Sequence, residues 1–353
     1  VLGLGNSPLG GSGEGEVEAT VAMALENGVN YFDMAAGDSA PFAPYGRATS
    51  GCRENVFFQI HFGAEYHTGK YGWTLNLEEI KRSVDWQLNQ LRTDYIDFGF
   101  LHCIDEEEDL EKAIGQGTIS YLLDLKKKGV VRHIGMSSHT PGVVQKVLDE
   151  NILDMLMFSI NPAYDYRHGE YAIGSVDERM DLYKRCEAEG VGISVMKAFG
   201  SGQLLDASTS PFGWALTEYQ CIQYALDKPG VVTVLPGVRN REDLKRLLGF
   251  FSATPEEKDY SILGTFAPQD ARGICVYCNH CQPCPAGLDV GLINKYYDLA
   301  QAGDALAKDH YANLTKKASD CIGCGHCNKR CPFSVDQVKR MREIAEYFSD
   351  SAV

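Results

Sequence analysis

Eight of the twelve cysteines in this 353-residue chain lie between residues 275 and 331, in two short runs. Within each run, two or three other residues separate successive cysteines, and a proline follows the last one. Tight clustering of this kind indicates metal ligation, whereas evenly spread cysteines would suggest disulfides. Zinc is a weaker alternative, because zinc sites do not usually take four cysteines from one run that ends before proline. The predicted metal ligands are Cys275, Cys278, Cys281, Cys284, Cys321, Cys324, Cys327 and Cys331.

The second run has the pattern C-x2-C-x2-C-x3-C-P, which resembles the cluster-binding run of bacterial ferredoxins. The first run is similar but one residue shorter before its last cysteine. The resemblance implies two [4Fe–4S] clusters, in which the cysteine before proline binds the other cluster of the pair. One cluster would then be held by Cys275, Cys278, Cys281 and Cys331, and the other by Cys284, Cys321, Cys324 and Cys327. Such clusters transfer single electrons at low potential and are sensitive to oxygen, which favours the cytoplasm of an anaerobe.

Ionisable side chains also stand at the carboxyl ends of predicted buried strands. Asp33 follows one such strand, His61 ends the next, and His102 and His139 follow later ones. Carboxylates and imidazoles are side chains that accept and release protons in catalysis. One polar residue at a strand end is more often structural, but several at one rim indicate a functional site.

The strands that must position these residues alternate with amphipathic helical patterns. The strand candidates are residues 1–5, 29–33, 56–62, 95–102, 131–137, 155–161, 191–197 and 231–236. The helix candidates are residues 15–27, 77–91, 119–128, 141–149, 176–189, 217–226 and 241–250. This alternation predicts an α/β fold, a (β/α)8 TIM barrel, in which functional residues lie at the carboxyl ends of the strands. A doubly wound sheet is the alternative, although no G-x-G-x-x-G run opens a helix after a strand.

The alternation of strands and helices ends near residue 255, ahead of the cysteine runs. We therefore expect two domains, a barrel over residues 1–267 and a small, mostly helical ferredoxin-like iron–sulfur domain over residues 268–353. Apolar residues at helical spacing over 288–299 predict a helix between the two cysteine runs.

Several segments of the predicted barrel resemble those of the aldo-keto reductases, in particular the branch with a ferredoxin-like tail. They are residues 2–5 (LGLG) with 8–11, 31–35 (YFDMA), 95–97 (YID) with 101–105 (LHCID), 133–139 (HIGMSSH), 195–200 (VMKAFG) and 235–237 (LPG). The resemblance implies a catalytic set of Asp, Tyr, Lys and His at the barrel mouth. In that set the Tyr protonates a carbonyl oxygen while NADPH delivers hydride.

Two members of this set are replaced in the chain. Asp33 and His102 match the family residues, but Asp38 stands at the position of the Tyr and His61 at that of the Lys. The resemblance therefore implies a catalytic set of Asp33, Asp38, His61 and His102. The alternative is an ordinary NADPH-dependent carbonyl reductase that uses the nearby Tyr45 instead. The family register places Tyr45 on a helix, where a core position is expected.

Three interpretations of the altered set stay open. The site is retuned for other acid–base chemistry on a small organic substrate, such as reduction of an activated bond, dehydration or isomerisation. Alternatively, Asp38 and His61 bind an additional mononuclear metal, since carboxylates and imidazoles suit Fe(II), zinc or manganese. Or the barrel is a non-catalytic scaffold, and the chain is an electron-transfer subunit.

The resemblance also makes NADP(H) a candidate cofactor. The residues at nucleotide-lining positions are Ser137, Asn161, Lys197 and Gly237, with Arg239 and Arg241 as candidates for a 2′-phosphate. Met157 and Leu247 depart from the family at two further nucleotide positions. Exposed charges at the start of a helix are the simpler interpretation of the two arginines.

The composition limits the partners. A net charge of −15 disfavours nucleic acid, and no apolar run approaches the roughly 20 residues of a membrane helix. Basic residues nevertheless gather in the tail, where they form either a solvated helix face or a docking surface for an acidic redox partner protein. They are Lys316, Lys317, Lys329, Arg330, Lys339, Arg340 and Arg342. We expect a cytoplasmic enzyme in which two clusters relay electrons to or from the barrel.

Overall fold

The structure, a computed structural model, describes residues 1–169, 171–265 and 272–350. The domain boundary predicted between residues 267 and 268 lies outside the described residues. The chain divides into two compact units. The barrel unit comprises Val1–Ile160, Ile193–Ala198 and Val232–Ala253, and the cysteine unit comprises Asn161–Gly192, Phe199–Val231 and Thr254–Val353.

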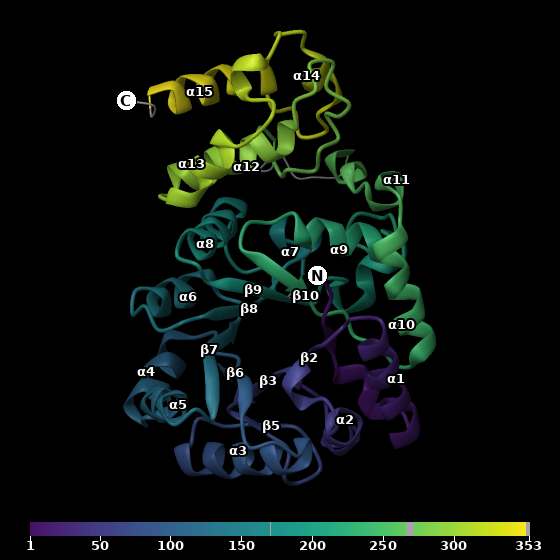
Figure 1. Ribbon diagram of the computed structural model, residues 1–353, viewed down its shortest axis with the longest axis vertical. Coiled ribbons are helices and arrows are strands. Elements are labelled where there is room, and N and C mark those ends of the chain that lie inside the picture. Colours follow the sequence, from purple (N-terminus) through teal and green to yellow (C-terminus); the bar gives the residue numbers. More distant parts are fainter. Residues whose placement is uncertain (170, 266–271, 351–353) are drawn as a thin grey trace. The chain divides into compact units, whose positions relative to one another are not determined.

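Eight strands form one sheet in chain order, and Figure 1 shows them arranged around a ring. They are β1 (Leu4–Gly5), β2 (Tyr31–Asp33), β3 (Phe57–Phe62), β6 (Ile96–Leu101), β7 (Val131–Ser138), β8 (Met155–Ser159), β9 (Gly192–Met196) and β10 (Val231–Val234). The pairs from β1 to β8 are parallel, and parallel bridges from Leu2 to Val234 and from Gly5 to Gly237 bring the two ends of the sheet together. The predicted (β/α)8 barrel is therefore confirmed.

The strands lie where the apolar runs predicted them, because parallel strands are buried on both faces and read as continuous hydrophobic segments. Every residue of β2 and β8 is buried, for example. The helices of the barrel unit are α1 (Glu14–Glu26), α2 (Phe42–Thr49), α3 (Leu77–Leu91), α4 (Glu107–Gly115), α5 (Thr118–Lys127), α6 (Pro141–Leu148) and α10 (Arg241–Leu248). The apolar patterns predicted neither α2 nor α4, although the family register placed Tyr45 on a helix, which is α2.

Helix α3 illustrates how local sequence sets these elements. The side chain of Asn76 accepts hydrogen bonds from the backbone N–H groups of Glu78 and Glu79, which caps the amino terminus of the helix. Ile80, Val84 and Leu91 then recur on its buried face. The helix therefore begins and ends where the apolar periodicity predicted.

A short hairpin follows β3 that the strand analysis did not predict. It pairs β4 (Ala64–Glu65) with β5 (Gly72–Trp73) in antiparallel register. Gly63 makes the turn into it with φ +116°, a conformation that side-chain-bearing residues rarely adopt. A Cβ at Gly63 would also lie 3.0 Å from the carbonyl oxygen of Thr74 and 3.3 Å from the Cβ of His102. The hairpin is thus held against the end of β6.

The cysteine unit is mostly helical among its described residues. Its helices are α7 (Pro162–Asp165), α8 (Val176–Ala188), α9 (Glu218–Leu226), α11 (Pro255–Lys258), α12 (Val290–Gln301), α13 (Ala305–Ala312), α14 (His326–Arg330) and α15 (Gln337–Asp350). Helix α12 confirms the helix predicted over residues 288–299. Short 3-10 helices in the chain span Ser7–Gly11, Arg53–Asn55, Gly200–Leu205, Gly249–Ser252, Ser261–Thr265 and Ala318–Asp320.

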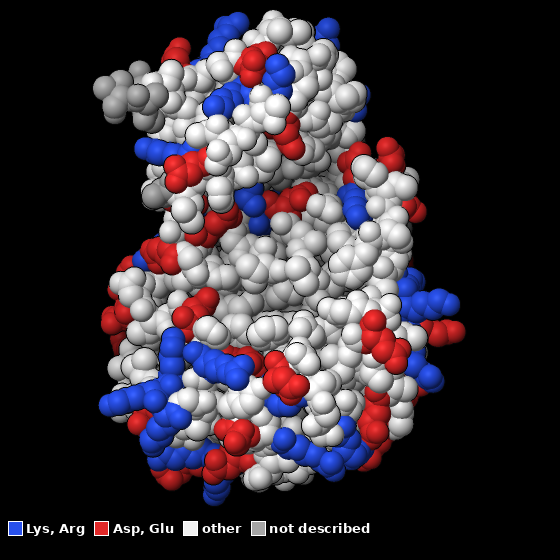
Figure 2. Space-filling model, viewed as in Figure 1, with Lys and Arg blue, Asp and Glu red and all other residues white. Residues whose placement is uncertain are grey.

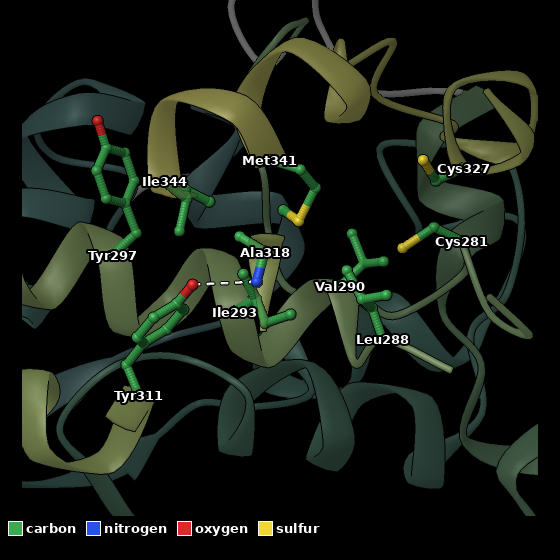
Figure 3. Packing of buried hydrophobic residues seen from close by; sticks show 10 residues of the cluster. All are labelled: Cys281, Leu288, Val290, Ile293, Tyr297, Tyr311, Ala318, Cys327, Met341 and Ile344. Atoms are coloured by element: carbon green, nitrogen blue, oxygen red, sulfur yellow. Dashed lines mark hydrogen bonds between the residues drawn. The ribbon is translucent and has the colours of Figure 1, made fainter. Parts of the chain in front are cut away.

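One hydrophobic cluster of this unit includes two of the predicted metal ligands. Figure 3 shows Cys281 and Cys327 at the same end of a cluster that also contains Leu288, Ile293 and Met341. The hydroxyl of Tyr311 accepts a hydrogen bond of 3.0 Å from the backbone N–H of Ala318 at the other end. The two cysteine runs are thus packed against a common core.

A buried polar network forms a second part of the unit. Asp165 accepts hydrogen bonds from Arg179 and Tyr183 at one carboxylate oxygen, at 2.8 and 2.7 Å, and from Tyr224 at the other, at 2.8 Å. All four side chains are buried. Among the described residues, no helix has the length and apolar composition needed to cross a membrane.

Candidate active site and cysteine clusters

Three of the four predicted catalytic residues form one hydrogen-bonded chain in the barrel unit. Oδ1 of Asp33 lies 2.7 Å from Nε2 of His61, and Nδ1 of His61 lies 3.0 Å from Nδ1 of His102. Asp33 ends β2, His61 lies near the end of β3, and His102 directly follows β6. Strands β2 and β3 pair with each other, as do β3 and β6, and this parallel register brings the three side chains together. Their exposed fractions are only 3%, 1% and 8%.

The chain continues to a residue that sequence reasoning missed. The hydroxyl of Tyr71 lies 2.9 Å from Nε2 of His102, and this tyrosine is 43% exposed. The neighbouring Trp73 donates its indole N–H to the carbonyl oxygen of His102 at 3.2 Å, which ties the hairpin to the same residue. The sequence feature that points to this contact is Gly63. This glycine follows β3 and allows the turn into the hairpin beside Tyr71. We call the connected side chains of Asp33, His61, His102 and Tyr71 the relay.

The inner end of the relay is supported by buried polar groups. The side-chain amide of Gln59 donates to Oδ1 of Asp33 at 2.9 Å and lies 3.1 Å from Nε2 of His61. The hydroxyl of Tyr31 in turn donates to the side-chain oxygen Oε1 of Gln59 at 2.6 Å. Met157, one of the two residues that depart from the family at nucleotide positions, contacts the same amide through its sulfur at 3.2 Å. These contacts hold the carboxylate of Asp33 in one orientation.

Burial decides the protonation of the outer half of the relay. It lowers the pKa of His102 well below its ordinary value, and the nearby charges of His61 and His139 act in the same direction. Burial also raises the pKa of Tyr71 to about 12, with a smaller contribution from Cys103. His102 is therefore neutral and Tyr71 is a protonated phenol at neutral pH.

Asp38 does not join the relay. Its Oδ1 accepts a hydrogen bond of 2.9 Å from the backbone N–H of Ala40, and its carboxylate packs on Gly10, where an added Cβ would lie 2.8 Å from both oxygens. Its backbone forms an antiparallel bridge with Lys70. The described contacts of Asp38 do not include His61, and the predicted catalytic role of Asp38 and the predicted metal site of this pair stay predictions. Asp38 instead supports the segment that carries Tyr71.

Tyr45 is a core residue rather than a replacement for the family tyrosine. It lies in α2, is 0% exposed, and packs its ring against Phe32 and Phe58. Burial raises the pKa of its hydroxyl, which has no hydrogen-bond partner among the described residues. A substrate at the barrel mouth could not contact this hydroxyl in the observed conformation.

A second cluster of ionisable groups surrounds His139. Its Nδ1 lies 2.9 Å from Oδ2 of Asp105, and its Nε2 lies 2.9 Å from Nζ of Lys197. Burial would raise the pKa of Asp105, but hydrogen bonds from His139 and Ser138 lower it to about 2. Lys197 and Cys103 have positive φ values of 56° and 51°.

These side chains also include a candidate ligand set for a single metal ion. Ligand atoms of Cys103, Asp105 and His139 lie within 4.8 Å of one another, the one such group of three among the described residues. The contacts between Asp105, His139 and Lys197 already satisfy these polar groups as hydrogen-bond partners. The cluster is therefore explained without a metal.

The residues predicted to line a nucleotide take varied positions. In the barrel unit, Ser137 accepts the backbone N–H of Cys103 at 2.8 Å, and a Cβ at Gly237 would lie 2.7 Å from Pro8. Asn161 belongs to the cysteine unit, where it caps α7 by accepting the N–H of Tyr164.

Arg239 and Arg241 flank the amino terminus of α10. Arg239 pairs with Asp243 at 2.8 Å, and Arg241 pairs with Glu16 at 2.9 Å. Their side chains are 70% and 52% exposed. A phosphate group bound here would have to compete with these carboxylates.

The eight predicted cysteine ligands fall into two neighbourhoods of the cysteine unit. A pocket is lined by Cys284, Cys321, Cys324 and Cys327, together with His326. The other four, Cys275, Cys278, Cys281 and Cys331, lie close enough to affect one another's ionisation. Burial raises the pKa of Cys275 to about 11 and that of Cys278 to about 12. These two sets have the same members as those implied by the ferredoxin resemblance.

The basic residues of the tail do not form one uniform surface. Arg340 turns inward and pairs with Asp298, while Lys316 and Lys339 lie 3.6 and 3.5 Å from Asp320 and Glu343. Figure 2 shows acidic and basic side chains interspersed on the face in view. Five of the seven basic residues are exposed and are therefore candidates for a docking surface, namely Lys316, Lys329, Arg330, Lys339 and Arg342.

Comparisons with known proteins agree on the barrel. A model of the aldo/keto reductase family matches residues 1–214. The uncharacterized oxidoreductase YqkF of Bacillus subtilis is 27% identical over 270 residues, which are 69% of this chain and 84% of that protein. The L-galactose dehydrogenase of Arabidopsis thaliana is 27% identical over 220 residues, 58% of this chain and 63% of that protein.

Solved structures show the same fold. The aldo-keto reductase AKR11C1 of Bacillus halodurans, in its holo form, has a TM-score of 0.60 at 23% identity and covers 76% of this chain and 92% of its own. An aldo-keto reductase of Klebsiella pneumoniae in complex with NADPH has a TM-score of 0.56 at 15% identity, covering 76% and 90%. Since the family model spans 214 of 353 residues, the chain belongs to the aldo/keto reductase family and is an oxidoreductase.

Proposed function

We propose that this oxidoreductase interconverts a carbonyl and an alcohol of a small organic substrate at the barrel mouth, with Tyr71 as the proton donor and acceptor. The observation that supports this proposal is the relay, whose three contacts of 2.7, 3.0 and 2.9 Å join Asp33 to the hydroxyl of Tyr71 through two imidazoles. Tyr71 is the exposed end of the relay, so it is the member that a substrate would contact.

Two proton arrangements satisfy the relay. In the inward arrangement Asp33 is ionised and every hydrogen bond of the relay points toward it. Tyr71 donates its hydroxyl to His102, His102 donates its Nδ1–H to His61, and His61 donates its Nε2–H to Asp33. In the outward arrangement Asp33 holds one further proton, each bond is reversed, and the hydroxyl of Tyr71 points to the substrate. Tyr71 gives its hydroxyl proton to the oxygen of the substrate and receives a proton from His102. His102 is then reprotonated by His61, and His61 by Asp33. These transfers convert the outward arrangement into the inward one.

This proton balance closes over one turnover. Reduction delivers one proton to the product and leaves Asp33 as a carboxylate. Uptake of one proton from solvent restores the outward arrangement. Oxidation of an alcohol runs the same steps in reverse, with Tyr71 accepting the proton. The phenol of Tyr71, with its pKa near 12, holds its proton at neutral pH until a more basic alkoxide develops.

NADP(H) fits the barrel unit as the hydride carrier, and when bound it would supply the hydride that accompanies this proton. The side chains of Arg239 and Arg241 are more than half exposed at the amino terminus of α10, where a phosphate would take the place of the carboxylates that they now contact. Ser137, Lys197 and Gly237 would line the nearer part of the cofactor. The NADPH complex of the Klebsiella pneumoniae structure supports the same assignment by analogy of fold.

Steady-state kinetics with NADPH and a panel of small aldehydes tests the proposal. Tyr71→Phe removes the transferable proton and is expected to lower kcat by about 10²- to 10⁴-fold while leaving KM nearly unchanged. Tyr45→Phe is the matched control, since it removes a buried hydroxyl that no substrate contacts, and it should keep kcat. Wild-type kcat in Tyr71→Phe would reject Tyr71 as the proton donor.

We further propose that the cysteine unit holds two [4Fe–4S] clusters, which would supply one-electron transfer. The supporting observation is that the eight cysteines fall into two groups of four, one of them lining a pocket. The chemistry of the donor set fits, because four thiolates are the usual ligands of such a cluster. The proposed iron–sulfur domain covers residues 268–353, after a barrel over residues 1–267.

An electron-transfer partner is the remaining part of this proposal. Lys329, Arg330 and Arg342 are exposed near the second cysteine run and would attract an acidic redox protein. Cross-linking or titration with an acidic one-electron carrier such as a ferredoxin tests this role. Association that weakens with added salt is the expected outcome, and salt-independent binding would contradict it.

A further inference from the structure

Lys228 is a fully buried lysine that lies in the cysteine unit just after α9. Its side chain is 1% exposed, and its ammonium group has no hydrogen-bond acceptor among the described residues. The nearest defined contact is the ring of Tyr224, whose centroid lies 3.9 Å from Nζ. A buried ammonium without an acceptor is costly, so lysine is almost never found in this state unless a partner is present.

The nearby carboxylates do not serve as that partner. The hydrogen bonds of Asp165 come from Arg179, Tyr183 and Tyr224, as described above, and none joins it to Lys228. Asp227 accepts hydrogen bonds from Tyr260 at 2.8 Å and from Gln223 at 2.7 Å. The three N–H donors of Lys228 therefore remain available to a group of negative charge.

The first cysteine run is connected to this ammonium through the rings of Tyr224 and Tyr260. The ring of Tyr260 packs on that of Tyr224 at 5.2 Å, and its hydroxyl lies 3.4 Å from the carbonyl oxygen of Val276, between Cys275 and Cys278. Burial lowers the pKa of Lys228, and the charges of nearby carboxylates and of Cys278 and Cys275 oppose that shift. Lys228 is thus within electrostatic range of two predicted cluster ligands.

We propose that Lys228 is the buried counter-charge of the [4Fe–4S] cluster held by Cys275, Cys278, Cys281 and Cys331, and that it raises the reduction potential of this cluster. The inference rests on the proposed iron–sulfur function. A cube with four thiolates is an anion, and reduction adds one more electron without forming or breaking a bond. A fixed cation in a poorly solvated interior stabilises the reduced form more than the oxidised form.

The second cluster site has no buried lysine or arginine in its described lining, and the cation beside Cys321, Arg342, is exposed. The described residues that line the pocket of Cys284, Cys321, Cys324 and Cys327 include His326 but neither lysine nor arginine. The two clusters should therefore differ in potential, with the more positive one beside Lys228. Electrons would then collect on that cluster.

A redox titration tests the proposal on the full chain, purified without oxygen and with its iron content measured. Dithionite is the one-electron reductant, and electron paramagnetic resonance reports each cluster. In Lys228→Met the more positive midpoint is expected to move to a lower potential, while the other midpoint and the iron content stay as in the wild type. Lys308→Met removes an exposed lysine of the same unit and should change neither midpoint. Unchanged midpoints in Lys228→Met with full iron would overturn the proposal.

A second variant keeps the test independent of how Lys228→Met folds. Cys324→Ser should leave the cluster beside Lys228 as the single intact one, and its midpoint should match the more positive value of the wild type. A match to the more negative value instead would also overturn the proposal. Absence of iron from the wild-type chain would reject the iron–sulfur function itself, a result distinct from either potential measurement.

Discussion

The Nδ1 atoms of His61 and His102 face each other across 3.0 Å, with the two ring planes at 82°. One of these nitrogens must carry a hydrogen and the other a lone pair, so the two imidazoles cannot both be cations. This contact explains why the charge of His61 helps to lower the pKa of His102. It also makes His61 the only bridge between the buried carboxylate of Asp33 and the exposed phenol of Tyr71 among the contacts of the described residues.

Replacing His61 tests that bridge directly. His61→Ala interrupts the relay between Asp33 and His102, and kcat is expected to fall by about 10²- to 10⁴-fold with little change in KM. His133→Ala removes a half-exposed histidine of β7 and serves as the matched control. Added imidazole should restore part of the lost kcat by occupying the space of the missing ring. If His61→Ala keeps wild-type kcat, the relay does not carry the proton of the reaction.

The lowered pKa of His102 predicts how stability depends on pH. The unfolded chain binds a proton at His102 more readily than the folded chain. The contribution of His102 to the free energy of unfolding is therefore present above pH 6.5 and is lost as the pH falls below that value. The free energy of unfolding should therefore decrease between about pH 8 and about pH 5.5. His102→Gln should show a smaller decrease in denaturant titrations at the two pH values. An equal decrease in both proteins would contradict the assignment.

Asp105 supplies an internal check on that result. Its pKa is lowered from 3.8 to about 2, so its contribution is present above pH 3.8 and is lost only as the pH falls from there toward 2. Asp105→Asn should therefore remove the loss of stability between about pH 4 and about pH 2, while the decrease that His102 causes between about pH 8 and about pH 5.5 persists. The two groups titrate in separate windows, which allows their effects to be told apart.

The sequence was sufficient to predict the barrel and the ionisable residues at its rim for a physical reason. Buried parallel strands read as continuous apolar runs, and the barrel geometry then places Asp33, His61 and His102 at one rim. It was insufficient for Tyr71, which lies beside strands of only two residues that have no measurable periodicity. For Asp38, alignment to a family position could not show that the loop carboxylate packs on Gly10.

Lys228 escaped prediction for a related reason. Near the end of an amphipathic helix a lysine is expected in solvent, where its charge favours the helix carboxyl terminus. Only the packing of Tyr224 and Tyr260 around it shows that its charge is enclosed. Long-range packing of this kind has no local signature in the sequence.

Gly46 in α2 offers a test of the barrel packing. An added Cβ would lie 2.2 Å from the carbonyl oxygen of Gln90 and 2.9 Å from the backbone of Leu91, so the backbone of α2 or α3 would have to move. Gly46→Ala is expected to lower the free energy of unfolding by about 1–3 kcal/mol, although alanine favours helices. Gly11→Ala is the matched control, since its Cβ would meet nothing within 4 Å. Equal denaturation midpoints in the two variants would show that α2 does not pack as closely as described.

Cysteine replacement tests the division of ligands between the two proposed clusters. Wild-type protein purified without oxygen should contain about eight irons, four for each cluster. Cys331→Ser and Cys324→Ser should each lose about four irons, because they remove ligands from different sets of four. Cys52→Ser changes a partly exposed cysteine of the barrel unit and should keep the full iron content.

The double variant of Cys331→Ser and Cys324→Ser distinguishes two assignments of the ligands. In one, each cluster takes its four ligands from one cysteine run, and in the other the last cysteine of each run binds the other cluster. Cys331 and Cys324 lie in the same run, so ligation run by run would make the double variant lose only one cluster. If the cysteine before proline in each run binds the other cluster, the double variant loses both clusters. Iron and sulfide contents of the double variant therefore decide between the two ligand assignments, and retention of about four irons would exclude the exchanged one.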